Sequence, residues 1–139
     1  MAAQQTYRLF VEELPNEQAA PAAGHVRVRT RMGVPVFLQG RAPTVRASLA
    51  NVAVANGQLS FALRNDGTRH TLARRILVRG RSAAGEPVFS QHVDGWYLLA
   101  QRRQTFQVTL PDTCDRVASI DVEATFEHDT VTERVAVLP

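Results

Sequence analysis

An alternating pattern near the start of the chain constrains its fold most strongly. Between residues 26 and 32, arginines alternate with apolar or β-branched residues, namely Val26, Val28, Thr30 and Met32. This period of two is typical of a β-strand with two unlike faces, and the extended stretch continues to Gln39. An earlier extended stretch, Tyr7–Pro15, is separated from it by a polar loop with small residues. The two stretches therefore predict a β-hairpin within residues 1–40.

The two stretches also carry a resemblance to a known family. YRLFVEELP at residues 7–15 and VPVF at residues 34–37 resemble the periplasmic pilus-assembly chaperones of the chaperone–usher pathway. In that family the hairpin forms the sixth and seventh strands of the first of two immunoglobulin-like domains. The resemblance therefore implies that residues 1–40 are the terminal hairpin of an incomplete first domain, and that residues 41–139 form a second β-sandwich domain.

The rest of the chain predicts short β-strands joined by tight turns. Candidates recur at intervals of about ten residues, at 45–55, 58–64, 71–78, 87–93, 96–100, 105–110, 117–126 and 130–138. Asn56-Gly57 is a strong hairpin signal, because both residues tolerate positive φ. No segment combines helical periodicity with caps. We therefore expect an all-β, antiparallel β-sandwich. Residues 63–72 and 96–106 resemble the second domain of the pilus chaperones, which implies that the sandwich is immunoglobulin-like.

Alternation within these candidates predicts which side chains face the core. In segment 58–64 we expect Leu59, Phe61 and Leu63 to face inward, and Ala62 to face outward. In segment 117–126 we expect Ile120, Val122 and Ala124 to alternate with outward-facing Asp121, Glu123 and Thr125. Pro87 at the start of segment 87–93 indicates an edge strand. Segments 80–85 and 111–115 are predicted loops.

Composition disfavours two classes of partner. The 139 residues carry 16 basic and 13 acidic side chains, and every basic one is an arginine. Because these arginines are spread among the acids rather than gathered in a patch, we expect no nucleic-acid binding. No apolar run approaches the roughly 20 residues of a membrane span, so we expect no membrane insertion. Cys114 is the only cysteine, and no intrachain disulfide can therefore form.

The cellular compartment is predicted differently by the two lines of reasoning. The first residues, MAAQQTYRLF, lack the basic region and long apolar stretch of a signal peptide. Taken alone, this start indicates a cytosolic protein. The resemblance implies a periplasmic protein, whose exporting sequence would belong with the rest of the first domain.

The sequence offers no catalytic constellation. None of the four histidines pairs with a cysteine or carboxylate at a metal-binding spacing, and no serine lies in a Gly-x-Ser-x-Gly context. Glu12 and Glu13 are adjacent in a predicted strand, so their carboxylates point to opposite faces and cannot act as a pair. We therefore expect a binding protein without enzymatic activity, cofactor or metal.

Strand-edge chemistry is the positive functional signal. An edge strand presents unpaired N–H and C=O groups with which another chain can pair. The resembled chaperones lend their seventh strand in this way to a pilus subunit, which they pass to an outer-membrane usher. The matching positions are Val26, Val28, Thr30 and Met32; alternatively, these side chains pack into the core of their own domain. The family also grips the subunit's terminal carboxylate with a base, for which Arg8 and then Arg31 are the candidates.

Two further expectations concern assembly and alternative functions. A two-stranded ribbon is marginal in water without further strands, so we expect a homodimer or larger assembly built through residues 6–38. The main alternative function is a generic adhesion or carbohydrate-binding β-sandwich module. Such a module needs exposed aromatic side chains on one face, and only Trp96, Tyr97 and Tyr7 are available for it. A small hydrolase on a β scaffold is a more distant alternative.

Overall fold

The computed structural model describes residues 3–15 and 28–137, and the chain divides into two compact units. One unit is Gln5–Leu38, and the other joins residues 1–4 to residues 39–139. Every strand pairing is antiparallel, and the described residues contain no α-helix. The predicted all-β, antiparallel class is therefore confirmed.

The first unit is a two-stranded ribbon. Strand β1, Gln5–Glu12, pairs with β2, Arg31–Leu38, in a continuous register that opposes Gln5 to Leu38 and Glu12 to Arg31. The expected strand from residue 26 is wrong at its start, because β2 begins only at Arg31. The same register would oppose Val28 to Pro15, which cannot donate a backbone hydrogen bond and restricts the residue before it. Val26 lies outside the described residues.

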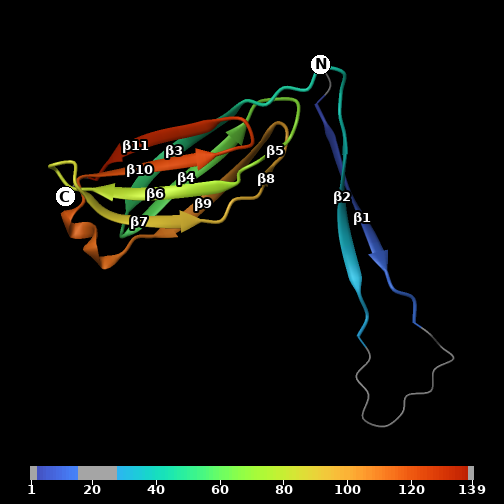
Figure 1. Ribbon diagram of the computed structural model, residues 1–139, viewed down its shortest axis with the longest axis horizontal. Helices are drawn as coiled ribbons and strands as arrows, with labels where there is room; N and C mark the ends of the chain where they lie inside the picture. Colours follow the sequence, from blue (N-terminus) through green and yellow to red (C-terminus); the bar gives the residue numbers. More distant parts are fainter. Residues whose placement is uncertain (1–2, 16–27, 138–139) are drawn as a thin grey trace, which may run out of the picture. The chain divides into compact units, whose positions relative to one another are not determined.

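The second unit contains two main sheets, whose strands overlap in the view of Figure 1. One has the order β11-β10-β6-β7 and the other the order β3-β4-β9, an arrangement consistent with a β-sandwich. A small additional sheet pairs β5 with β8. The bounds are β3 Ala47–Ala55, β4 Gln58–Asn65, β5 Thr71–Leu72, β6 Arg75–Arg81, β7 Pro87–Val93, β8 Tyr97–Leu98, β9 Arg102–Thr109, β10 Ser119–Thr125 and β11 Thr130–Ala136.

The core of this unit is built from the inward residues of both sheets. The predicted inward sets of β4 and β10 are confirmed, since all six side chains are at most 1% exposed: Leu59, Phe61, Leu63, Ile120, Val122 and Ala124. Ile76 and Val78 of β6 are equally buried, and Phe61 stacks on Phe106 of β9 with ring centroids 5.1 Å apart. Interdigitation of these side chains between the sheets is the main stabilising contribution.

Two residues expected to face solvent are buried. Ala62 of β4 lies between Ala50 and Thr105 on its neighbouring strands, and its single methyl group is covered from both sides. Asp121 of β10 is buried because the guanidinium groups of Arg81 and Arg134 contact its carboxylate. Alternation along one strand does not show which side chains are covered by residues of the neighbouring strands.

The turns and the ends of the strands agree with the prediction only in part. Asn56 and Gly57 adopt left-handed backbone, with φ angles of 51° and 72°, as a two-residue hairpin requires. Strand β7 begins at Pro87 and lies at the edge of its sheet, as expected. The single strand expected at 71–78 is wrong, because β5 and β6 are separate and pair with different strands. The loop expected at 80–85 is also shorter, since β6 continues to Arg81, and Asp112–Arg116 form a 3₁₀ helix.

Candidate protein-binding ribbon

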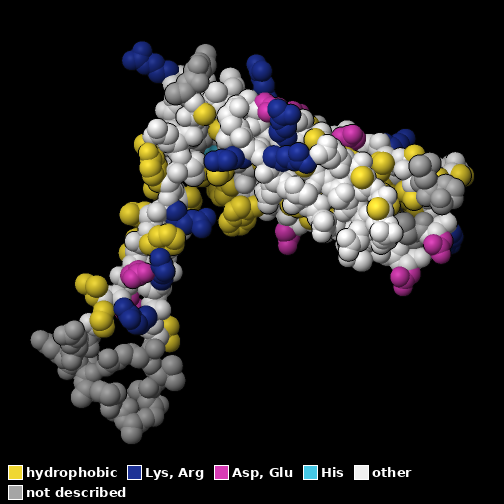
Figure 2. Space-filling model, turned by 180° about the vertical axis from the view of Figure 1, so that it is seen from behind, with side chains coloured by type: hydrophobic (Ala, Val, Ile, Leu, Met, Phe, Trp, Pro, Cys, Tyr) yellow, Lys and Arg dark blue, Asp and Glu magenta, His cyan; other side chains and the backbone are white. Residues whose placement is uncertain are grey.

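The β1–β2 ribbon has one almost entirely apolar face. Side chains directly opposite each other in an antiparallel pair lie on the same face, so the register assigns each residue to one side. Apart from Gln5, one side carries large apolar residues only, which are 37% to 58% exposed: Tyr7, Leu9, Val11, Met32, Val34, Val36 and Leu38. Figure 2 shows hydrophobic side chains gathered along the ribbon, with arginine and glutamate among them. We call these seven residues the apolar face.

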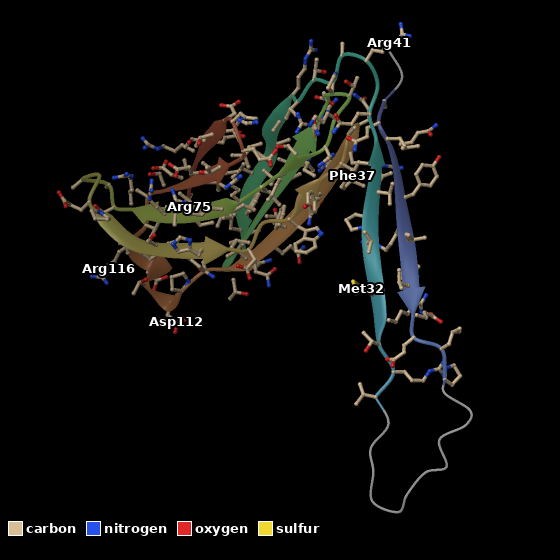
Figure 3. The ribbon with its side chains drawn as sticks, turned by 45° about the vertical axis from the view of Figure 1, so that its right-hand side comes forward. Met32, Phe37, Arg41, Arg75, Asp112 and Arg116 are labelled. Carbon is tan, nitrogen blue, oxygen red and sulfur yellow. The ribbon has the colours of Figure 1, made fainter. Side chains whose placement is uncertain are left out.

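The opposite side, the mixed face, carries charged and aromatic residues: Thr6, Arg8, Phe10, Glu12, Arg31, Gly33, Pro35 and Phe37. The Arg31 Nε lies 2.9 Å from the Glu12 Oε1, and the Arg31 guanidinium carbon lies 4.3 Å from the centre of the Phe10 ring. Phe10 is opposed to Gly33, whose missing side chain leaves room for the ring. Figure 3 marks Met32 and Phe37, which are assigned to opposite faces of β2.

The phase of the hydrogen bonds follows from one contact at the end of the ladder. The Glu13 amide nitrogen donates to the Thr30 carbonyl oxygen at 3.0 Å, and these residues are the next opposed pair after Glu12 and Arg31. Opposed pairs alternate between hydrogen-bonded and non-hydrogen-bonded ones. Residues of the apolar face therefore direct their N–H and C=O groups at the partner strand, whereas residues of the mixed face direct theirs outward.

The two outer edges of the ribbon differ in their donors. Within the described residues, no third strand pairs with either β1 or β2. The outward positions of β2 include Pro35, which has no N–H group, so the row of donors is interrupted there. The outward positions of β1 contain no proline. The outer edge of β1 therefore presents an unbroken row of N–H donors, whereas the row on β2 is unbroken only before Pro35.

The candidate subunit-binding residues lie on both faces of the ribbon and in the segment before β2. Met32 belongs to the apolar face, and Arg8 and Arg31 both belong to the mixed face. Thr30 and the strongly exposed Val28 precede β2. Within the described part of the chain, Arg31 already has Glu12 and Phe10 as partners, whereas no ion pair engages Arg8. Arg8 is therefore the better candidate to bind an added carboxylate.

A small hollow lies at the end of the ribbon where β2 begins. Its volume is about 240 Å³, and it is lined by Glu12, Glu13, Arg29, Thr30 and Arg31. The structure thus brings Thr30 and Arg31 together with two carboxylates. Such a lining can bind polar or charged groups of a partner but offers no apolar pocket.

Sequence reasoning missed most of the apolar face. Leu9, Val34 and Val36 are not among the residues predicted to bind a subunit, yet they lie at its centre. The alternation that ends at Met32 in the prediction in fact continues through Val34 and Val36 to Leu38. A hairpin register with Glu12 opposite Arg31 would have revealed the face, because it places Leu9 opposite Val34.

The residues on both sides of the ribbon in the sequence are held by one turn of the sandwich unit. The Gln4 amide nitrogen donates to the Thr68 carbonyl, and the Gln4 side-chain oxygen accepts from the His70 amide at 2.7 Å. The Thr68 amide in turn donates to the Thr44 carbonyl at 2.8 Å. Burial, together with the nearby Arg69 charge, lowers the pKa of His70. Gln4, directly before β1, and Thr44, six residues after β2, are therefore both fixed to this turn.

Two kinds of site were searched for elsewhere among the described residues. Residues 3–15 and 28–137 contain no group of three or more His, Cys, Asp or Glu placed to hold a metal, and no helix that could span a membrane. The Trp96 and Tyr97 rings meet edge to face, at 85°. The two rings together therefore do not form one flat surface.

Comparison with known proteins adds no assignment: no protein-family model matches the chain, and no curated protein does either.

Proposed function

We propose that this chain binds other polypeptides by strand addition to its β1–β2 ribbon, as a fragment of a pilus-assembly chaperone. The observation that carries the proposal is the exposed apolar face on a ribbon whose outer edges lack a third strand among the described residues. Burying the exposed half of seven large apolar side chains contributes about 5–10 kcal/mol before ordering costs. A partner strand can use this gain together with backbone hydrogen bonds.

The resemblance of YRLFVEELP and VPVF to the chaperone–usher family supports a pilus subunit as the partner. In the described part of the predicted donor stretch Val26 to Met32, Arg31 and Met32 belong to β2; a subunit strand paired there would precede Pro35 and so avoid the interruption in the β2 edge. Arg8 would pair with the terminal carboxylate of the subunit. In the periplasm, the chain would then pass the subunit to an outer-membrane usher.

The topology of the second unit also supports this family. Sheets with the orders β3-β4-β9 and β11-β10-β6-β7 correspond to the ABE and GFCC′ strands of an immunoglobulin-like sandwich. We propose this correspondence as the fold of residues 41–139. In this proposal the chain works by binding, without catalysis, and no observation favours a carbohydrate-binding module over it.

A retention experiment tests the proposal. A pilus subunit that lacks its own completing strand is immobilised and offered the full chain. We expect retention, a strong loss with Met32→Asp on the apolar face, and no loss with Gln107→Asp, an exposed change on β9 of the sandwich unit. Equal retention of both variants, or none of the unaltered chain, would contradict the proposal.

The role of Arg8 is tested separately. Amidation of the subunit's C-terminus removes the carboxylate while leaving its strands unchanged. If Arg8 binds that group, amidation weakens binding to the unaltered chain about tenfold or more but has little further effect on Arg8→Ala. An equal effect of amidation on both proteins would show that Arg8 does not bind the carboxylate.

A further inference from the structure

The outer edge of β1 presents a continuous template for another strand. Thr6, Arg8, Phe10 and Glu12 all direct their N–H and C=O groups away from β2, as the hydrogen-bond phase requires. Every residue of β1 is exposed. A long exposed edge of this kind favours pairing with another chain.

The charges on this edge are complementary to themselves when the strand is reversed. Arg8 and Glu12 stand two positions either side of Phe10, and their backbone groups point to the same edge. An antiparallel copy of β1 centred on Phe10 therefore opposes each Arg8 to Glu12 of the second copy. It also opposes the two Phe10 side chains, and both kinds of pair stabilise antiparallel strands.

We propose that the outer edge of β1 pairs with the same edge of a second copy of this chain, antiparallel and with Phe10 on the two-fold axis. The two ribbons then form one sheet with the order β2-β1-β1-β2. Four strands are stable where an isolated two-stranded ribbon is marginal. The two-fold axis closes the assembly, so the contact produces a dimer rather than a fibre.

The neighbouring register is less favourable on charge grounds. Sliding one copy by two residues toward Leu9 opposes Arg8 to Phe10 and Thr6 to Glu12, so both charge pairs are lost. Sliding it by four residues, so that Arg8 lies on the axis, opposes two guanidinium groups directly. In the proposed register Glu12 lies between Arg31 of its own ribbon, 2.9 Å away, and Arg8 of the second copy. Each carboxylate is then flanked by two cations.

The outer edge of β2 is a poorer site for a second copy. Pro35 removes one donor from the middle of that edge, and an antiparallel β2 pair centred nearby loses hydrogen bonds from both copies. The dimer therefore leaves the β2 edge available. Arg8 takes part in both proposals, so Met32→Asp in the retention experiment tests the subunit site and sedimentation tests the dimer, and the two proposals can fail separately.

Sedimentation equilibrium of the full chain over a range of concentrations tests the dimer. We expect a monomer–dimer equilibrium for the unaltered chain. Arg8→Pro removes an outward N–H without touching the β1–β2 bonds, and we expect it to raise the dimer dissociation constant about tenfold or more. Arg8→Glu keeps the N–H but opposes two acids, and we expect the constant to rise about fivefold. Pro35→Ala, the matched change on the other edge, should leave it unchanged.

Each alternative result overturns the proposal. A chain that remains monomeric at the highest concentration shows that the β1 edge does not pair with itself. A dimer that survives both Arg8 variants uses another surface. A dimer that Pro35→Ala strengthens pairs through β2. Circular dichroism of each variant verifies that the strands are retained.

Discussion

Asn65 offers the sharpest test of how the sandwich unit holds the turn that precedes His70. It is fully buried at the end of β4, and its side chain makes four hydrogen bonds. The side-chain oxygen accepts from the Gly67 amide at 2.9 Å and the Arg46 amide at 3.2 Å. The side-chain nitrogen donates to the Arg69 carbonyl at 2.8 Å and the Leu98 carbonyl at 3.3 Å.

Replacing Asn65 by alanine removes all four bonds. The Gly67 amide is left without an acceptor in a buried position, which costs about 1–3 kcal/mol. The other three groups lie nearer solvent or have weaker bonds, and together they add about 1 kcal/mol. We therefore expect Asn65→Ala to lower the free energy of unfolding by about 2–4 kcal/mol, which corresponds to a melting temperature lower by roughly 10–20 °C.

Urea and thermal unfolding followed by circular dichroism measure this effect. Gln58→Ala, an exposed change at the other end of β4, is the matched control and should stay within about 0.5 kcal/mol of the unaltered chain. A loss below about 1 kcal/mol for Asn65→Ala would refute the reasoning, because the network would then contribute no more than a surface residue.

Three further predictions concern other parts of the chain. Gly67→Ala places a methyl group against the Thr44 backbone and should lower the free energy of unfolding by about 2–3 kcal/mol. At Gly57 an added methyl group meets no atom, so Gly57→Ala should lower it by only about 1–2 kcal/mol, because of the positive φ. Similar losses for both variants in urea unfolding would argue against the collision at Gly67. Hydrogen bonds from Arg134, followed by those from Arg81, lower the pKa of Asp121. The stabilising contribution of this carboxylate is therefore present above about pH 4 and is lost as the pH falls through its folded-state pKa. Asp121→Asn should make the free energy of unfolding less dependent on pH on the acid side, and an unchanged pH dependence would contradict this. Leu9→Ser on the apolar face should leave the sandwich unit's unfolding within about 0.5 kcal/mol, and a larger loss would place Leu9 in that unit's core.

Local signals predicted the parts of the fold that depend on neighbouring residues alone. Asn56-Gly57 predicts its hairpin because two positive φ angles suffice, and the alternation of Leu59, Phe61 and Leu63 predicts their burial. The split between β5 and β6 was not predictable in this way. The Ala73 amide bonds to the Trp96 carbonyl and the Arg74 amide to the Thr125 carbonyl, so adjacent residues pair with different strands.

The strand at the candidate site was predicted from the sequence, but its start and its full apolar face were not. Alternation near Met32 indicated a strand with an apolar side, and the exposed ribbon agrees with that part. The start of β2 depends on Pro15 across the hairpin, and the full apolar face depends on the register that opposes Leu9 to Val34. Register is a property of two strands together, so neither strand shows it alone.

Residue-resolved amide hydrogen exchange tests most directly whether the outer edges of the ribbon receive another polypeptide. In the dilute, monomeric chain we predict fast exchange at Thr6, Arg8 and Phe10, whose N–H groups point outward, and slower exchange at Leu9 and Val11. Adding a partner strand or raising the protein concentration should slow the outward amides of the strand that pairs. Outward amides of both strands that are already protected in the dilute chain, and that no partner slows further, would contradict the account.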